Sequence, residues 1–140
     1  DREWETLKNR LHERLNASKK LDLFLSDNTK ASKALREEID YGINKKGLPI
    51  IVIYPDYKDK TDICDSNGIK KQIKDLWNQL PVFRDNMDKV ATLHVPYKKL
   101  LITKALQDSD FKVQTMTDGI VKKCAVGEYP KSEIDRYQAA

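Results

Sequence analysis

The 140-residue sequence is poor in the residues that metal and redox sites require. It has two cysteines and two histidines, and Cys64 and Cys124 match no metal-binding or redox spacing. No cluster of histidines, cysteines and carboxylates indicates zinc, so we expect no metal ion and no bound cofactor. Two cysteines far apart in the sequence are typical of a reducing compartment, which predicts a cytoplasmic location.

Glycine and long apolar runs are also scarce. None of the five glycines lies in a phosphate-binding loop of the GxGxxG or GxxxxGK type. No apolar run approaches the roughly 18 residues of a membrane-spanning helix, and the charged N-terminus carries no secretory signal. We therefore expect a soluble domain with no membrane partner.

The net charge of +4 is small and spread along the chain. Lys-Lys pairs recur, mostly at predicted helix ends or on polar helix faces. A nucleic-acid surface would need a concentrated basic stripe, usually with stacking aromatic side chains. We expect no nucleic-acid partner.

Apolar periodicity predicts that helices and strands alternate, which is typical of an α/β fold with a parallel sheet and right-handed crossovers. The strand at 21–25 is expected to be buried on both faces. The predicted order is helix 2–18, strand 21–25, helix 32–46, strand 48–54, polar loop 55–67, helix 68–80, strand 90–95 and helix 96–107.

Apolar stripes and terminal residues define the predicted helices. The first helix has an apolar stripe at helical spacing, made of Trp4, Leu7, Leu11 and Leu15, with His12 on a polar face. Ser32 is the expected N-cap of the second helix. That helix buries Leu35, Ile39 and Ile43 and stops at Gly47, whereas Pro81 ends the third helix.

The remaining elements are less regular. His94 falls within an apolar strand, where a hydrogen-bonded structural histidine is the simplest interpretation. Residues 112–117 are interpreted as an edge strand, and Ser132 as the cap of a short final helix. We predict one domain over residues 1–110 and a C-terminal extension, 111–140, packed on it.

Ligands of parallel α/β sheets bind at the carboxyl ends of the strands. Ser26, Asn28 and Thr29 follow the first strand, and Ser32 and Lys33 begin the next helix. These side chains can donate to phosphate or ribose, with help from the helix dipole. Tyr54, at the end of the next strand, is a further candidate for binding, as are its neighbours Asp56 and Tyr57.

The run DLFLSDNTKASKALREEIDYGINKKGLPIIVIYPDY, at 22–57, resembles the centre of a TIR-like domain. It is most similar to the bacterial branch that includes the TIR proteins of Thoeris anti-phage defence. In that branch a strand and polar turn precede Ser-Lys, a helix with Trp-Val-Arg-x-Glu-Ile, and a strand. The matching positions here are Ser32-Lys33, Leu35-Arg36, Glu38-Ile39 and Pro49–Tyr54.

The resemblance covers about residues 3–106 and implies a flavodoxin-like, TIR-like three-layer fold. The first β-α-β unit of such a fold has no counterpart in residues 1–20, because residues 2–18 fit the helix after the second strand. The tryptophan of the motif is also missing, since Ala34 occupies its place.

The resemblance implies that Glu38 is the catalytic residue of an NAD-cleaving enzyme. NAD or a related nucleotide would be the substrate, and the product would be ADP-ribose or a cyclic form that signals in antiviral defence. Ser26, Asn28, Thr29, Ser32, Lys33 and Tyr54 would then contribute to binding the nucleotide.

Other interpretations stay open. Glu38 can be a solvated surface residue paired with Arg36 or Lys45, and Ser32 only a helix cap. The domain can be a non-catalytic module that associates with other TIR-like chains. A response-regulator-like domain would need a phosphorylated Asp at a strand end with an acidic pair upstream, and only Asp56 lies near such a place.

Overall fold

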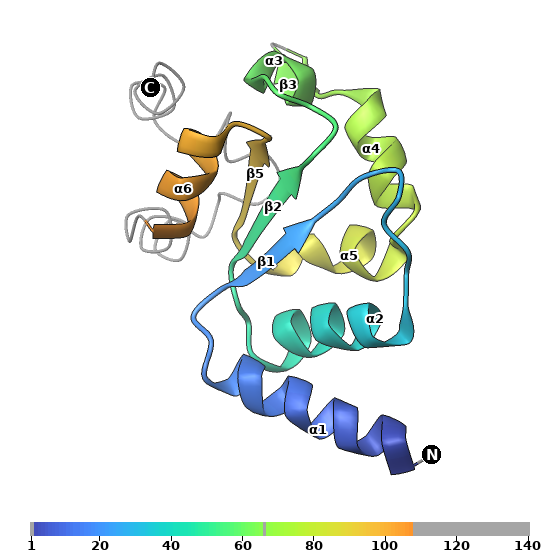
Figure 1. Cartoon of the computed structure of the whole chain (residues 1–140). Coiled ribbons are helices and arrows are strands. Elements are labelled where there is room, and N and C mark those ends of the chain that lie inside the picture. The colour runs from blue at the N-terminus through green and yellow to red at the C-terminus, as the bar shows by residue number, and fades with distance from the viewer. Residues whose placement is uncertain (1, 66, 108–140) are drawn as a thin grey trace.

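The structure is a computed structural model that describes residues 2–65 and 67–107. The predicted strand at 112–117, the helix capped by Ser132 and Cys124 lie outside the described residues. The described elements, shown in Figure 1, are α1 (Arg2–Asn16), β1 (Leu21–Phe24), α2 (Lys33–Asp40), the π-helix η1 (Tyr41–Lys45), β2 (Ile50–Tyr54), α3 (Lys60–Ile63), β3 (Cys64–Asp65), β4 (Gly68–Ile69), α4 (Lys71–Asn78), α5 (Pro81–Asn86), the 3-10 helix η2 (Met87–Lys89), β5 (Thr92–Pro96) and α6 (Lys99–Gln107).

The centre of the fold is a three-stranded parallel sheet with the order β1-β2-β5. The register aligns Leu23 with Val52 and Val52 with His94. This sheet confirms the predicted α/β class and parallel topology, in a flavodoxin-like arrangement. A separate two-stranded antiparallel pair joins β3 to β4.

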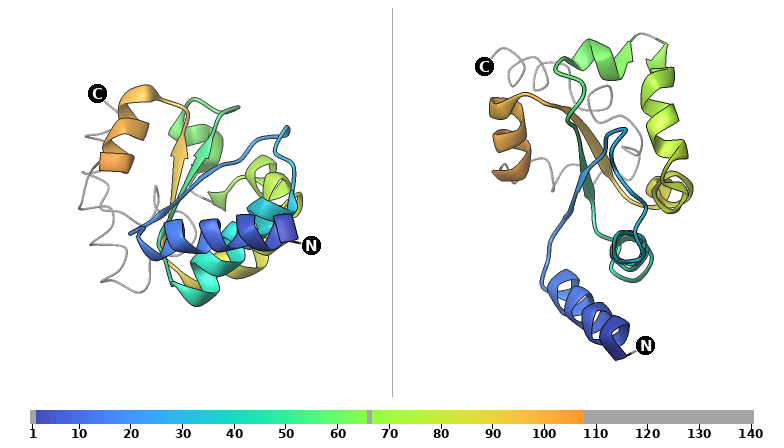
Figure 2. Two further views of the ribbon diagram at one scale, coloured as in Figure 1. Left: turned by 60° about the horizontal axis from the view of Figure 1, so that its bottom comes forward. Right: turned by 45° about the vertical axis from the view of Figure 1, so that its right-hand side comes forward.

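Helices cover the two faces of the sheet unequally (Figure 2). Alternate side chains of β2 point to opposite faces, as the pleat requires. Val52 and Tyr54 pack in the larger core with residues of α1, α2, α4 and α5. Ile51 and Ile53 pack in a smaller core against α6. No helix in the described part of the chain is long and apolar enough to cross a membrane.

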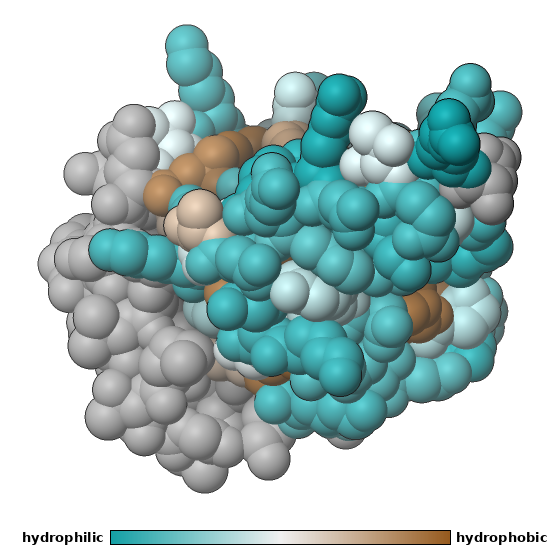
Figure 3. All heavy atoms as spheres, turned by 90° about the horizontal axis from the view of Figure 1, so that it is seen from below, coloured by the Kyte–Doolittle hydropathy of each residue, from teal (hydrophilic) through white to brown (hydrophobic). Residues whose placement is uncertain are grey.

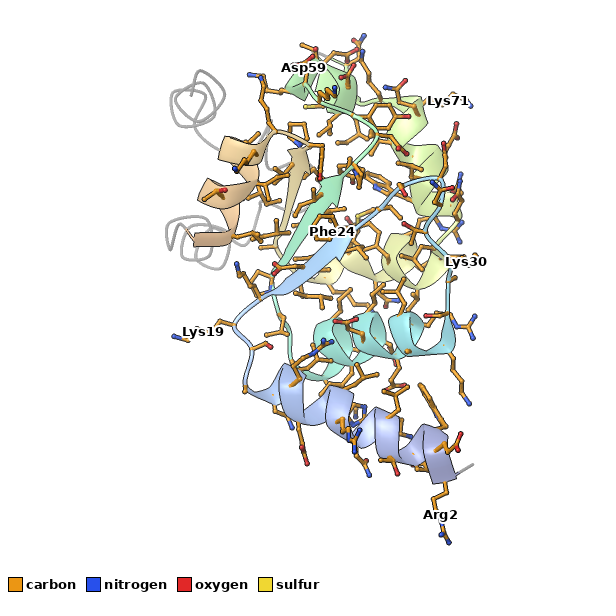
Figure 4. All side chains as sticks on the ribbon, in the orientation of Figure 1. Arg2, Lys19, Phe24, Lys30, Asp59 and Lys71 are labelled. Carbon is orange, nitrogen blue, oxygen red and sulfur yellow. The ribbon has the colours of Figure 1, made fainter. Side chains whose placement is uncertain are left out.

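Burial of β1 on both faces is a wrong prediction. Leu21 and Leu23 are buried, but Asp22 and Phe24 are exposed, and Phe24 keeps 52% of its surface accessible. The cause is the position of β1 at one edge of the described sheet, where α6, which packs on β2 and β5, does not cover it. Figure 4 marks Phe24 on this strand.

The predicted stripe of α1 is wrong at one position. Leu15 is buried and Leu11 is partly buried, but Leu7 is 44% exposed. The side of α1 that faces the protein includes His12 instead, although this residue was predicted on a polar face. Polar side chains of α2 contact this side of α1. Apolar periodicity does not predict contacts between polar groups, so it places the wrong side of α1 against the protein.

The segment around α2 follows the prediction closely. The Ser32 hydroxyl oxygen accepts a hydrogen bond from the Leu35 amide at 3.1 Å, which confirms the N-cap. Ile39 and Ile43 are buried, and Leu35 packs partly buried against the same core. The helix changes to the π-helix η1 and ends before Gly47, whose φ of 60° suits glycine.

Residues 55–90 differ most from the prediction. The expected loop contains α3 and β3, and the expected helix at 68–80 begins only at Lys71, because Gly68 pairs in β4 with a φ of 105°. α4 ends at Asn78, before Pro81, and the proline instead occupies the first turn of α5, which the sequence did not predict. Proline is favoured there because its missing N–H would have no helical partner.

Candidate functional site

The predicted binding residues after β1 form a compact turn. The Ser26 amide donates to Thr29 Oγ1 at 2.9 Å, and the Asn28 amide donates to Ser26 Oγ at 3.2 Å. Thr29 Oγ1 also donates to the Phe24 carbonyl at 3.3 Å. The turn is therefore held by its own side chains, which hydrogen-bond nearby backbone groups as serine, threonine and asparagine prefer. Figure 4 labels Lys30 just beyond it, on the way to α2.

Glu38 lies on α2 and is held by a cation from α1. Arg14 Nη2 donates to Glu38 Oε1 at 2.5 Å. The Glu38 side chain is 22% exposed, whereas that of Arg14 is 58% exposed. Neither of the predicted partners, Arg36 or Lys45, takes this place. The carboxylate is thus mostly covered, but its partner reaches it from the solvent side.

The neighbouring carboxylate makes a separate contact with the same helix. Glu37 Oε2 lies 2.7 Å from His12 Nε2, and the His12 ring stacks on Tyr41 at 3.8 Å between centroids. The Tyr41 hydroxyl donates to Asn16 Oδ1 at 2.8 Å. The contact of α1 with α2, called the seam below, therefore depends largely on polar groups.

The N-terminal end of the seam contains the predicted binding residue Lys33. Its ammonium lies 4.4 Å from the centre of the Trp4 ring. A cleft of about 330 Å³ opens here, lined by side chains of α1, α2 and α5, among them Trp4, Lys8, Lys33, Arg36, Glu37 and Asp40. From below, where α1 lies, the molecule is mostly hydrophilic with small hydrophobic areas (Figure 3).

Glu38 lies outside this cleft. The lining residues of α2 occur at spacings of three and four, which places them along one stripe of the helix. Glu38 follows Glu37 by one residue, or about 100° around the helix axis. Arg14, its partner, is absent from the lining as well. The structure brings Lys33 and Glu38 onto one helix but not into one pocket.

Tyr54 is fully buried in a chain of hydrogen bonds. Trp77 Nε1 donates to the Tyr54 hydroxyl at 3.0 Å, and that hydroxyl lies 2.7 Å from His94 Nδ1. Because indole can only donate, the Tyr54 hydroxyl oxygen accepts from Trp77 and forms a second hydrogen bond with the His94 ring. His94 is thus a hydrogen-bonded strand histidine, as predicted.

The buried position of His94 changes its titration. Burial lowers its pKa from 6.5 to about 3, because the imidazolium would lose its hydration. Its Nε2 has no hydrogen-bond partner among the described residues. His94 is therefore neutral at physiological pH.

Sequence reasoning missed the partners that α1 supplies to α2. Trp4, His12 and Arg14 come from a helix that pattern analysis treated as a simple amphipathic helix. Trp4 stands beside Lys33, the residue that precedes Ala34. No group of three or more potential metal ligands occurs in residues 2–65 and 67–107.

Comparison with known families supports the predicted resemblance. Residues 1–60 match the sequence model of the family described as Thoeris protein ThsB, TIR-like domain. The matched segment runs from α1 to the start of α3 and includes Glu38, the turn after β1 and all of β2. The match bears out the predicted resemblance to a TIR-like domain over residues 1–60.

Proposed function

We propose, with the resemblance of residues 1–60 to a TIR-like domain as the premise, that the protein cleaves NAD⁺ at the bond between nicotinamide and ribose. Glu38 would be the catalytic carboxylate. The supporting observation is that Glu38 lies within the matched segment and is mostly covered, with a partly exposed cation as its partner. Such a carboxylate can exchange Arg14 for a substrate without leaving the surface of α2.

The chemistry requires few groups. Nicotinamide leaves with the electron pair of the glycosidic bond, so the cationic pyridinium becomes neutral and needs no general acid. The ribose carbon becomes oxocarbenium-like, and a nearby carboxylate stabilises that charge. Addition of water and loss of its proton give ADP-ribose, whereas attack by a nucleophilic atom of the same molecule gives a cyclic product.

The protein would bind NAD as a substrate and retain no cofactor. Ser26, Asn28 and Thr29 lie in the turn after β1, and Ser32 caps α2. Of the expected binding residues, Tyr54 is fully buried. We therefore assign the reaction to Glu38. We assign binding of the phosphates to side chains that are accessible to solvent, which excludes Tyr54.

Nicotinamide release from NAD⁺ tests this proposal. We would measure it by chromatography for the whole protein, for Glu38→Gln and for Glu37→Gln. Glu37→Gln is the matched control, because the neighbouring carboxylate contacts His12 and not Arg14. Loss of turnover in Glu38→Gln alone supports the proposal. Equal turnover by wild type and Glu38→Gln, or no release by the wild type, rejects it.

A second candidate is a non-catalytic module that associates with other TIR-like chains. The observation in its favour is that β1 lies at one edge of the described sheet and presents Phe24 to solvent. Exposed apolar side chains beside an unpaired strand favour contact with another chain. Light scattering at increasing concentration, for the wild type and for Phe24→Asp, tests it. A wild type that stays monomeric contradicts this candidate.

A further inference from the structure

The cleft between α1, α2 and α5 is lined by three cationic side chains and two carboxylates, and the cations have only weak ionic partners. In the described chain, Lys33 forms no ion pair and contacts the Trp4 ring, and Arg36 Nη1 donates to the Ala31 carbonyl at 3.0 Å. Lys8 lies 3.8 Å from Glu5, whose side chain is 59% exposed. A contact of this kind is weak in water.

The carboxylates of the same cleft already have other partners. Glu37 contacts His12 at 2.7 Å, and Asp40 accepts a hydrogen bond from Asn44 Nδ2 at 2.6 Å. Within the described part of the chain, no ion pair links either carboxylate to a cation of the cleft. Lys33 and Arg36 are therefore available to an anion, and Lys8 can join them by exchanging its exposed contact with Glu5.

We propose that this cleft, henceforth the Trp4 cleft, binds a nucleotide through its phosphate and its base. The phosphate would lie between Lys8, Lys33 and Arg36, because several oxygens can accept from three cationic donors at once. The base would stack on the Trp4 indole, whose face attracts planar groups. The Lys33 ammonium, which now covers that face, would turn to the phosphate.

The dimensions of the Trp4 cleft agree with such a ligand. Its volume of about 330 Å³ lies at the lower end of the range of roughly 300–1,000 Å³ that is common for small-molecule sites, and the cleft is open to solvent. Val82 of α5 contributes an apolar part of the wall. Because Glu38 is outside the lining, this site does not depend on NAD cleavage.

Adenosine monophosphate is the appropriate probe, because it has a base and a phosphate but no nicotinamide bond to cleave. We would titrate the whole ¹⁵N-labelled protein with adenosine monophosphate, inorganic phosphate and adenosine, and follow the indole and backbone N–H signals. The expected result is a saturable shift of the Trp4 indole and of amides near Lys8 and Lys33, while the Trp77 indole stays unchanged. Phosphate and adenosine should each bind more weakly.

Two variants and a control identify the groups involved. Lys33→Gln should lower the affinity for adenosine monophosphate about tenfold, as expected for loss of one charged hydrogen bond. Trp4→Leu should weaken binding of the nucleotide but leave binding of inorganic phosphate unchanged. Lys71→Gln is the control, because Lys71 is 89% exposed and lies on α4, away from the cleft.

The proposal fails if millimolar adenosine monophosphate does not shift the Trp4 indole. It also fails if Lys33→Gln binds as tightly as Lys71→Gln, or if phosphate alone binds as tightly as the nucleotide. If Trp4→Leu unfolds α1, the comparison of Lys33→Gln with Lys71→Gln still decides the question, because Lys33 is exposed and its replacement changes only a surface side chain.

Discussion

The buried histidine makes the stability of the protein depend on pH in a predictable way. In the folded protein the pKa of His94 is lowered to about 3, whereas the unfolded chain has the ordinary value of 6.5. Between these values the unfolded state binds one proton more than the folded state. The free energy of unfolding therefore falls as the pH falls through this window, and the contribution is complete above it.

The size of the effect follows from the two pKa values. The His94 contribution falls by about 2 kcal/mol from pH 7 to pH 5, with about 1.4 kcal/mol for each further unit down to about pH 3. Urea unfolding at pH 5, 6 and 7 measures it. The comparison is with His94→Gln, whose amide can hydrogen-bond to the Tyr54 hydroxyl but cannot titrate.

The difference between the two proteins isolates His94, because all other titrating groups are shared. We expect the wild type to lose about 2 kcal/mol more than His94→Gln between pH 7 and pH 5. Equal losses would refute the reasoning. If the variant does not fold, NMR titration of the His94 ring in the wild type decides the matter, and protonation near pH 6.5 in the folded state would refute it.

Four further outcomes follow from other contacts. Arg14→Gln should raise NAD turnover about fivefold in the nicotinamide assay. The reason is that the Arg14–Glu38 ion pair competes with the substrate, and an exposed ion pair contributes about 1 kcal/mol. Unchanged or lower turnover contradicts this prediction. Ser32→Ala should lower the free energy of unfolding by about 1 kcal/mol through loss of the cap, with Ser32→Thr nearly neutral in the same urea titration. Gly47→Ala should cost about 1–2 kcal/mol from its positive φ, although no atom blocks the added methyl group, and Gly47→Asn should cost less; equal stability of all three proteins refutes the strain argument. Tyr54→Phe should cost about 2–4 kcal/mol, since it leaves two buried nitrogens without this partner, and a loss below 1 kcal/mol would show that they find others.

The sequence predicts the parts of this fold that local chemistry determines. The apolar β-branched run at 48–54 identifies β2, and a continuous run of this kind is typical of a strand covered on both faces. Ser32 and Gly47 mark the ends of the second helical segment because each satisfies a backbone requirement that few residues meet. These signals act over only a few residues.

The parts that were missed depend on short elements or on docking. The pair β3–β4 has two residues in each strand, and α5 has six residues, so neither is long enough to produce a recognisable period. Glu38 and Arg14 are 24 residues apart, and their contact depends on the side of α1 that faces α2. The same limit applies to Tyr54 and His94, which meet only when β2 and β5 pair.

The polar seam also determines which part of the molecule opens most readily. Leu15 is the single residue of α1 that is fully buried, and the other contacts described for this helix are charged, hydrogen-bonded or aromatic. Ion pairs weaken as salt is added, whereas the apolar contacts of the sheet do not. Amide hydrogen exchange in α1 should therefore be faster than in β2, and faster still at high ionic strength. Local detachment of this helix would uncover Glu38 while the sheet stays folded.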